Sequence, residues 1–322
     1  MGNTASTTKG ADDFYEFKEW GKPELAIVPG DLLVSLTYSP YEYIVIKKEF
    51  EKKAPRGGEN KWDIPREEFS MDQIIGAGNF GKVYKGKMNG KVIAIKISKG
   101  GQMSTKEFLA EAEIMKKCQH ENLVELLGIC TDQKQIFIIS EFMSNGSLLD
   151  YMKTKKSLQL DAMIGIAAQI ANGMAFLESK RIVHRDLAAR NVLIGKDKIA
   201  KVADFGLARL LPSDQNVYTS RGSGFPIKWT APEGFRGEFT TKSDVWSFGI
   251  VVIEIMNKGR EPYPGIANGE ILQKLESGYR QPKPENCPQE LYDAVISCWQ
   301  ENPTRRPSFA SLYATLRSMQ IV

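Results

Sequence analysis

The sequence predicts an α+β protein that is long enough for two domains or lobes, preceded by a short β-rich segment. Most strand-like runs, which are short stretches of β-branched and aromatic residues between turn residues, lie before residue 140. One helical pattern interrupts them, and the long apolar helical patterns lie after that point. A chain of 322 residues is also long enough for two lobes that each have a core.

The composition is that of an ordinary soluble globular protein, with 25% charged and 42% hydrophobic residues. The net charge of +4 is small for the length and is spread through the sequence, so we expect no nucleic-acid partner. The longest apolar run, residues 248–256, is too short to span a bilayer, and the N-terminus lacks the apolar core of a secretory signal. The cysteines have no metal-ligand spacing and are predicted to be free thiols in a reducing compartment: Cys118, Cys130, Cys287 and Cys298.

The N-terminus carries a pattern for lipid attachment. Residues 1–6, Met-Gly-Asn-Thr-Ala-Ser, match the N-myristoylation signal, in which Gly2 is acylated after Met1 is removed. The alternative is an ordinary terminus rich in Thr and Ser. The first thirty residues offer no cysteine for a second acyl chain and no basic excess. We expect residues 1–23 to be flexible and a single acyl chain to give only weak peripheral membrane contact.

The chain is predicted to have two ordered parts. In residues 24–50, three β-type runs alternate with turn residues, which indicates a short β-rich segment. Residues 51–68 are charged and include two adjacent glycines, so we expect a linker there. The remaining residues, 69–322, are predicted to form the two-lobed domain.

A glycine-rich turn lies at residues 76–81, where glycines are spaced as Gly-x-Gly-x-x-Gly between β-type residues. By itself this motif also fits a dinucleotide-binding turn, which opens a helix. Here residues 82–86 are typical of another strand, and Met88-Asn89-Gly90 is typical of a hairpin turn after it. The pattern therefore predicts a strand–loop–strand arrangement.

A lysine on a strand and a glutamate on the following helix are predicted to pair. Lys96 lies on the strand-like run 92–97. The helical pattern that starts at Ser104 places Glu111 on the same face as three apolar residues, Phe108, Ala112 and Met115. Because a carboxylate on an apolar face is costly unless it is paired, we expect an ion pair with Lys96. For Glu111 considered alone, the alternative is a solvated side chain at the edge of that face.

Two acids and an amide follow strand-like runs in the second half of the chain. Asp186 and Asn191 lie in the loop 184–191, and Asp204 begins an Asp-Phe-Gly sequence after the run 199–203. Carboxylate and amide oxygens can bind a divalent cation, and a carboxylate can accept a proton from a hydroxyl. These residues are therefore the candidate active site.

In this order the motifs resemble the protein kinases, and closely the cytoplasmic, non-receptor tyrosine kinases of the Src type. The resemblance covers residues 62–322. It implies the two-lobed protein kinase fold, with a small β-rich lobe that has one helix and a larger helical lobe. It implies transfer of the γ-phosphate of ATP to tyrosine hydroxyls of proteins, with Mg²⁺ or Mn²⁺ as the metal. It also implies a cytoplasmic protein, which an acyl chain on Gly2 would hold in part at the inner face of the plasma membrane.

The resemblance also implies roles for single residues. Asp186 would accept the proton of the substrate hydroxyl, and Arg190 would complete the catalytic loop. Lys96, oriented by Glu111, would face the α- and β-phosphates. The remaining implied residues are Asn191 and Asp204 for the metal, and Ile75, Gly76, Ala77, Gly78, Asn79, Phe80, Gly81, Lys82, Val83, Glu141 and Met143 for ATP.

The catalytic loop indicates the substrate class. Kinases that act on serine and threonine usually carry lysine two residues after the catalytic aspartate, whereas this chain has Ala188 there and Arg190 four residues after it, as tyrosine kinases do. Residues 225–229 likewise resemble their platform for a tyrosine ring. The alternatives are a dual-specificity or serine/threonine kinase, or a kinase-fold scaffold. A scaffold would be expected if one of the active-site residues had been lost, and none has.

The resemblance further implies regulation. Tyr218 matches the autophosphorylation site of the family, and Arg185 and Arg209 would receive its phosphate. Ser140 falls at the gatekeeper position beside the hinge. The chain ends without the inhibitory tail of Src-type enzymes, so we expect no inhibition of that kind. Residues 24–36 faintly resemble part of a Src homology 3 domain, as a degenerate remnant or as a small sheet packed on the kinase.

Overall fold

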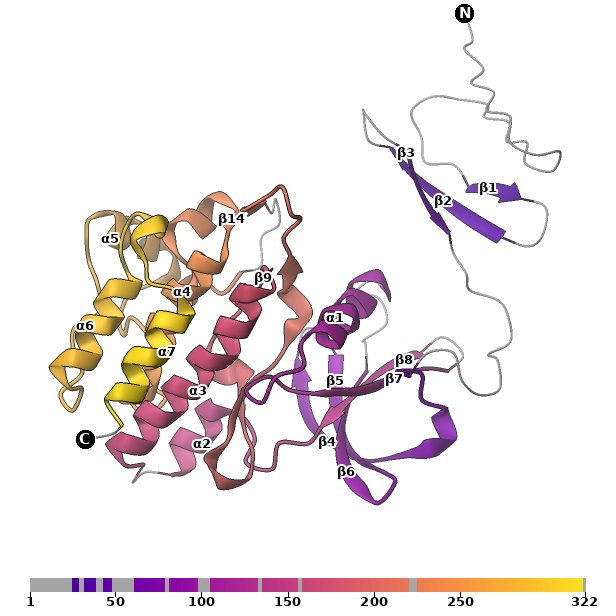
Figure 1. Ribbon diagram of the computed structural model, residues 1–322, viewed down its shortest axis with the longest axis horizontal. Coiled ribbons are helices and arrows are strands. Elements are labelled where there is room, and N and C mark those ends of the chain that lie inside the picture. The colour runs from indigo at the N-terminus through magenta and orange to yellow at the C-terminus, as the bar shows by residue number, and fades with distance from the viewer. Residues whose placement is uncertain are drawn as a thin grey trace, which may run out of the picture. The chain divides into compact units, whose positions relative to one another are not determined.

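The computed structural model describes residues 61–78, 81–97, 105–132, 135–155, 158–219 and 225–320, together with the backbone of three strands between residues 25 and 47 (Figure 1). The chain divides into two compact units, Met1–Lys61 and Trp62–Val322. The expectations for Gly2, Asn79 and Phe80 lie outside the described residues.

The first unit contains a three-stranded antiparallel sheet in the order β1-β2-β3. The strands are β1 (Leu25–Val28), β2 (Leu32–Tyr38) and β3 (Tyr43–Lys47). Each strand covers one of the three β-type runs that the sequence indicates, because the turn residues between the runs separate the strands.

The small lobe of the second unit is an antiparallel five-stranded sheet in the order β4-β5-β6-β8-β7 (Figure 1). The hairpin between β5 and β6 turns at Asn89 and Gly90, as predicted, and both residues have positive φ. One helix, α1, lies against the sheet, with Phe108, Ala112 and Met115 buried. The bounds are β4 (Phe69–Gly78), β5 (Gly81–Met88), β6 (Lys91–Ile97), α1 (Thr105–Lys117), β7 (Leu126–Asp132) and β8 (Gln135–Glu141).

The second unit begins at Trp62, so residues 62–68, which we placed in the linker, belong to it. The Ile64 amide donates to the Ile129 carbonyl at 2.8 Å, and the Ile129 amide donates to the Trp62 carbonyl at 2.7 Å. These bonds add a short bridge along β7, followed by the 3₁₀ turn η1 (Arg66–Glu68). The entry to the domain is therefore hydrogen-bonded to the small lobe.

The large lobe is built around α4, which is buried at every position from Ser243 to Met256. The helix begins with a capping box between Thr240 and Ser243. The neighbouring α3 is long and apolar enough to span a membrane by length and composition, but its apolar residues form part of the lobe's core. The helices are α2 (Leu148–Thr154), α3 (Leu160–Ser179), α4 (Thr241–Met256), α5 (Ile271–Glu276), α6 (Gln289–Cys298) and α7 (Phe309–Ser318).

Short strands and 3₁₀ turns form the segments between the helices of the large lobe. Three two-stranded antiparallel sheets pair β9 with β12, β10 with β11, and β13 with β14. The strands are β9 (Ile182–Val183), β10 (Val192–Ile194), β11 (Ala200–Val202), β12 (Arg209–Leu210), β13 (Tyr218–Thr219) and β14 (Glu238–Phe239). The turns are η2 (Ala189–Asn191), η3 (Lys196–Lys198), η4 (Phe205–Leu207), η5 (Ile227–Trp229), η6 (Pro232–Arg236), η7 (Asn268–Glu270) and η8 (Pro303–Arg305).

A buried ion pair joins the turn η6 to the segment that precedes α7. Arg306 donates from Nη1 to Glu233 Oε1 at 2.6 Å and from Nη2 to Glu233 Oε2 at 2.9 Å. Ser243 on α4 donates to the same carboxylate at 2.9 Å. A buried charge is tolerated when its hydrogen bonds are made, and here the partners come from three separate parts of the lobe. The pair is therefore structural.

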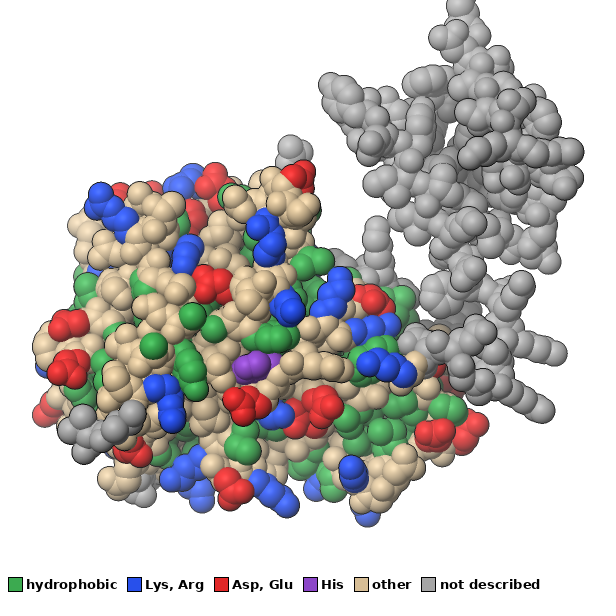
Figure 2. Space-filling model, in the orientation of Figure 1, with side chains coloured by type: hydrophobic (Ala, Val, Ile, Leu, Met, Phe, Trp, Pro, Cys, Tyr) green, Lys and Arg blue, Asp and Glu red, His purple; other side chains and the backbone are tan. Residues whose placement is uncertain are grey.

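The described cysteines are all free and buried, as the sequence predicts. On the face of the second unit that Figure 2 shows, blue and red side chains are interspersed over the described surface.

Candidate active site

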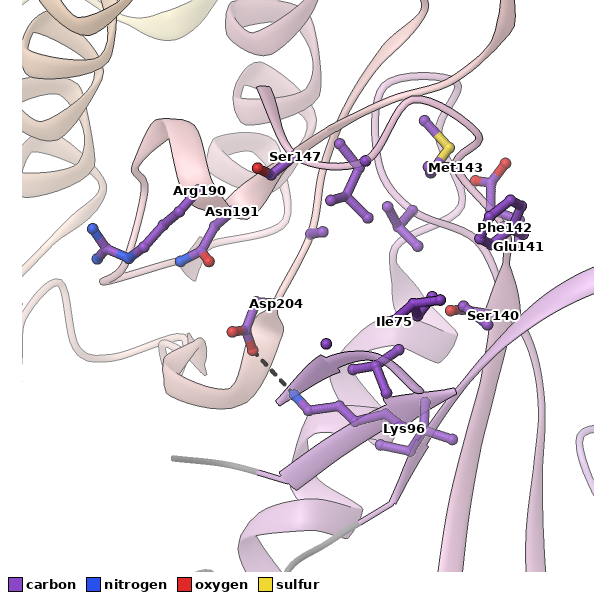
Figure 3. Close-up of a pocket in the computed structure, with 18 of the residues that line it drawn as sticks. Ile75, Lys96, Ser140, Glu141, Phe142, Met143, Ser147, Arg190, Asn191 and Asp204 are labelled. Atoms are coloured by element: carbon purple, nitrogen blue, oxygen red, sulfur yellow. Dashed lines mark hydrogen bonds and ion pairs between the residues drawn. The ribbon is translucent and has the colours of Figure 1, made fainter. Parts of the chain in front are cut away.

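A cavity of about 610 Å³ lies between the two lobes of the second unit. Its volume is typical of a site for a small organic ligand. The lining brings together four parts of the chain: the glycine-rich turn, β6, the hinge after β8, and the loops around Asn191 and Asp204 (Figure 3). Predicted nucleotide-binding residues in the lining are Ile75, Gly76, Ala77, Gly81, Val83, Lys96, Glu141 and Met143, and Ser140 lines it beside them. Lys82 lies in β5 but does not line it.

Lys96 joins the small lobe to the large lobe. Its Nζ lies 2.7 and 2.8 Å from the two carboxylate oxygens of Glu111 on α1, and 3.1 Å from Asp204 Oδ1. Figure 3 shows the Lys96 side chain reaching from β6 toward Asp204. Burial by itself would lower the pKa of Lys96, but the carboxylates of Asp204 and Glu111 outweigh it and raise the pKa. The predicted pair of Lys96 with Glu111 is confirmed, and Asp204 joins it as a second acid.

Asp204 has an unusual backbone, with φ of 59° in the left-handed region. It precedes η4, whose Phe205 is fully buried and packs edge-on against His184 with ring centroids 5.5 Å apart. A Cβ on Gly206 would lie 3.4 Å from both Asp204 Oδ1 and Glu111 Oε2, an ordinary contact distance, so Gly206 lies beside the two carboxylates. Burial favours a higher pKa for Asp204, but Lys96 outweighs it and lowers the pKa. Asp204 is therefore held ionised.

The catalytic loop presents Asp186. Arg190 donates from Nη2 to Asp186 Oδ1, and Asn191 donates from Nδ2 to the Asp186 carbonyl at 2.7 Å. The Asn191 carbonyl in turn accepts from the Ala203 amide at 2.8 Å, next to Asp204. Burial raises the pKa of Asp186, and the Arg190 cation opposes this rise. Asn191 and Asp204 thus both line the cavity, and Asp186, which is not among the lining residues, is hydrogen-bonded to Asn191.

The backbone of this loop is held by Asp244, which the sequence analysis did not single out. Its two carboxylate oxygens accept from the His184 amide at 2.7 Å and from the Arg185 amide at 2.9 Å. Burial in α4 raises the pKa of Asp244 to about 6. The sequence does carry one indication of this role. An acid in a helix that is apolar on every side must be buried, and it therefore needs hydrogen-bond donors from other parts of the chain.

The hinge residues lie where the sequence predicts. Glu141 Oε1 accepts from Lys201 Nζ at 2.6 Å and from the Glu125 amide at 2.8 Å, so its side chain links β8 to the large lobe. The Met143 carbonyl accepts from the Gly146 amide at 3.2 Å and closes the turn before α2. The Glu141 carboxylate is therefore structural, and a nucleotide at the hinge would meet backbone groups.

Tyr218 and the two predicted phosphate-receiving arginines also meet. The Arg185 guanidinium lies 4.6 Å from the centre of the Tyr218 ring, and that of Arg209 lies 5.7 Å from it. The pairing of β13 with β14 holds Tyr218 opposite Phe239. Both cations therefore face the tyrosine before any phosphate is attached.

The donor set fits a divalent cation that takes few protein ligands. Among the described residues no three His, Cys, Asp or Glu side chains form a metal-binding group. Asp204 offers a carboxylate and Asn191 an amide oxygen at the same side of the cavity. Mg²⁺ is bound in this way, through one or two protein oxygens, water and substrate phosphates.

Comparisons with known proteins agree with this geometry. The family described as protein tyrosine and serine/threonine kinase matches residues 69–316. Tyrosine protein-kinase src-1 of Caenorhabditis elegans is 52% identical over 265 residues, which are 79% of this chain and 49% of the relative. The chain therefore spans about half the length of this relative. The chain belongs to the protein kinase family, and its kinase domain is of the Src-type, non-receptor tyrosine kinase class.

Proposed function

We propose that this chain is an active protein tyrosine kinase, which transfers the γ-phosphate of ATP to tyrosine hydroxyls of proteins. The observation that carries the proposal is the meeting of Lys96, Glu111 and Asp204 in one ion cluster beside Asp186 and Asn191. Of these five residues, Lys96, Glu111, Asn191 and Asp204 line the cavity. Buried polar groups destabilise a fold unless they are paired, so a scaffold would not need this cluster, whereas phosphoryl transfer requires it.

The roles follow from what each side chain can do. Asp186 accepts the proton of the tyrosine hydroxyl as the phenolic oxygen attacks the γ-phosphorus and ADP leaves. Arg190, bonded to Asp186, holds the carboxylate in place. Lys96, kept cationic and oriented by Glu111, attracts the α- and β-phosphates.

ATP and a divalent metal belong to kinase chemistry in general. We propose Mg²⁺, with Mn²⁺ as a substitute, held by Asn191 and Asp204; the ion would neutralise phosphate charge when bound. The glycine-rich turn, residues 75–83, would cover the phosphates, and the backbone at Glu141 and Met143 would meet adenine.

Tyrosine specificity rests on the catalytic loop and the platform. Ala188 stands where serine/threonine kinases carry lysine, and the Arg190 guanidinium lies 4.4 Å from the centre of the Trp229 ring. We propose that this pair lies beside the substrate ring and favours a phenol over the shorter alkyl hydroxyls. The alternative of a dual-specificity or serine/threonine kinase lacks such support.

The test is phosphoamino-acid analysis after incubation of the purified chain with labelled ATP, Mg²⁺ and a mixed tyrosine and serine peptide substrate. We expect phosphotyrosine in the peptide and in the chain itself. Mainly phosphoserine would reject the tyrosine assignment. No transfer by the wild-type chain would reject the kinase proposal.

Phosphorylation of Tyr218 is proposed to activate the enzyme. A phosphate adds strong acceptors beside Arg185 and Arg209, which already contact the ring, and charge-assisted bonds would hold the segment more firmly. Tyr218→Phe keeps the ring contact but cannot carry phosphate. We expect it to lower peptide kinase activity by about 5- to 150-fold, the range typical of regulatory coupling. Rates measured after preincubation with ATP would check this, and equal rates for both proteins would contradict it.

The N-terminal residues are proposed to direct part of the protein to the membrane. We propose that Gly2 is myristoylated and that the protein exchanges between the cytoplasm and the inner face of the plasma membrane. A single acyl chain binds membranes with an association constant of about 10⁴ M⁻¹, which is marginal. Gly2→Ala is expected to move the protein wholly to the soluble fraction without changing its rate on a peptide. Cell fractionation measures the shift, a peptide kinase assay measures the rate, and intact mass reports the acylation. An unacylated wild-type Gly2 would contradict the proposal.

The β-rich segment 24–50 stays a candidate remnant of a Src homology 3 domain.

A further inference from the structure

We propose that Trp229 is a positioning residue for the proton acceptor: it holds the Arg190 guanidinium against Asp186 and is itself held by the buried carboxylate of Glu254. The inference rests on the proposed kinase function and extends it. It assigns a positioning role to Trp229 and Glu254, which are not among the residues proposed to bind the nucleotide or metal or to accept the proton.

Arg190 lies in contact with both partners. Its guanidinium carbon is 4.4 Å from the centre of the Trp229 ring, and its Nη2 donates to Asp186 Oδ1. The Arg190 side chain is 35% exposed, so its ion pair alone would be weak, because ordering a long side chain costs entropy. A planar guanidinium stacked on an indole ring is attracted by the ring and restricted by it. The contact with the Trp229 ring therefore restricts the Arg190 side chain more than the ion pair alone would.

Trp229 is fixed at both its side chain and its backbone. The indole Nε1 donates to Glu254 Oε2 at 2.8 Å, and the carbonyl of Trp229 accepts from Ser247 Oγ at 2.8 Å. Glu254 and Ser247 both belong to α4, which is buried along nearly its whole length. The ring that contacts Arg190 is thus hydrogen-bonded to the buried helix α4.

Glu254 also holds the catalytic loop directly. The oxygen that accepts from Trp229 accepts from the Ala189 amide at 3.0 Å, and Ala189 is the residue before Arg190. The Glu254 side chain is 2% exposed, and a carboxylate at that depth is tolerated only with donors of this kind. One carboxylate thereby fixes the catalytic loop and the η5 turn relative to each other.

The consequence is a chain of contacts from α4 through Trp229 and Arg190 to Asp186. Proton transfer depends on the placement of the acceptor, and a displacement of about 1 Å can cost about 10²-fold in rate. If Trp229 served only as a surface for the substrate ring, its effect would not depend on Arg190. This difference can be measured.

The experiment is a double-mutant cycle in the full chain, with Trp229→Leu introduced into the wild type and into Arg190→Ala. In the wild type, loss of the ring should lower kcat by about 3- to 30-fold and leave KM for ATP unchanged. In Arg190→Ala, the same substitution should change kcat by less than about two-fold, because coupled residues are not additive. Trp229→Phe keeps a ring face for the cation but loses the donor to Glu254, so it should recover only part of kcat.

The controls distinguish a displaced Arg190 side chain from a general loss of folding. Glu261→Gln breaks the ion pair of Glu261 with Lys228, a neighbour of Trp229 in η5, and should leave kcat unchanged. Thermal unfolding of each variant reports its fold, and Trp229→Met carries the same cycle if the leucine variant does not fold. Equal fold-losses in both backgrounds would overturn the inference while the kinase proposal stands. A wild-type chain without transfer would instead remove the proposed function.

Discussion

Asp186→Asn is expected to lower kcat for tyrosine phosphorylation by about 10²- to 10⁴-fold, the range for loss of a general base. Asparagine has nearly the same shape as aspartate but cannot accept the proton of the phenol. The Asp186 carbonyl, which accepts from Asn191 at 2.7 Å, is unchanged by the substitution, so the loop should keep its conformation. Steady-state kinetics with a tyrosine peptide measures the loss, and KM for ATP should remain close to that of the wild type.

The matched control is Asp197→Asn. Asp197 is an exposed aspartate in η3, between β10 and β11, and its φ of 53° is one that asparagine tolerates. This variant should keep the wild-type rate and thermal stability. A wild-type rate for Asp186→Asn, with both variants folded, would refute the role of Asp186.

Lys96→Met is expected to have the next largest effect, a fall of about 10²- to 10³-fold in kcat/KM for ATP, as when a preorganised electrostatic contact to the reacting group is removed. Methionine keeps an unbranched chain but leaves no cation between Glu111 and Asp204, whose carboxylates now lie at 2.7 and 3.1 Å from Nζ. Removing one partner of a buried pair costs about 3–5 kcal/mol of stability. Denaturant unfolding and initial rates measure the two losses separately.

A second substitution distinguishes these two losses. Glu111→Gln added to Lys96→Met removes the unpaired carboxylate, which is 3% exposed, and should recover part of the stability. It should not recover activity, because the cation that meets the phosphates is still absent. Recovery of activity in the double variant would show that Lys96 acts only on the fold.

Several parts of the site could be predicted because their signals are local. Lys96 on a strand and Glu111 on an apolar helix face each carry a charge that needs a partner, and a pair between them satisfies both. The same holds for the hairpin turn at Asn89 and Gly90, where positive φ selects the residue types. The turn is determined by neighbouring residues, and the need of each charge for a partner can be read from the residue type and its position on the strand or helix.

Other parts depend on contacts between distant segments. Nothing near Asp244 in the sequence indicates that it accepts from the amides of His184 and Arg185, which lie 60 and 59 positions away. The boundary at Trp62 was likewise decided by hydrogen bonds to β7. Such bonds form only when the helices and sheets have packed together. They leave no periodic pattern in the sequence from which they could be predicted.

The sequence by itself therefore determined the residue types of the site, their order and the family to which they point. Only the tertiary structure decided how they are held: Asp204 joins the Lys96 pair at 3.1 Å, and Glu254 on α4 joins the catalytic loop to Trp229. The physical reason is that a buried charge requires partners but does not specify which ones. The packing of α4 beneath the loops makes that choice.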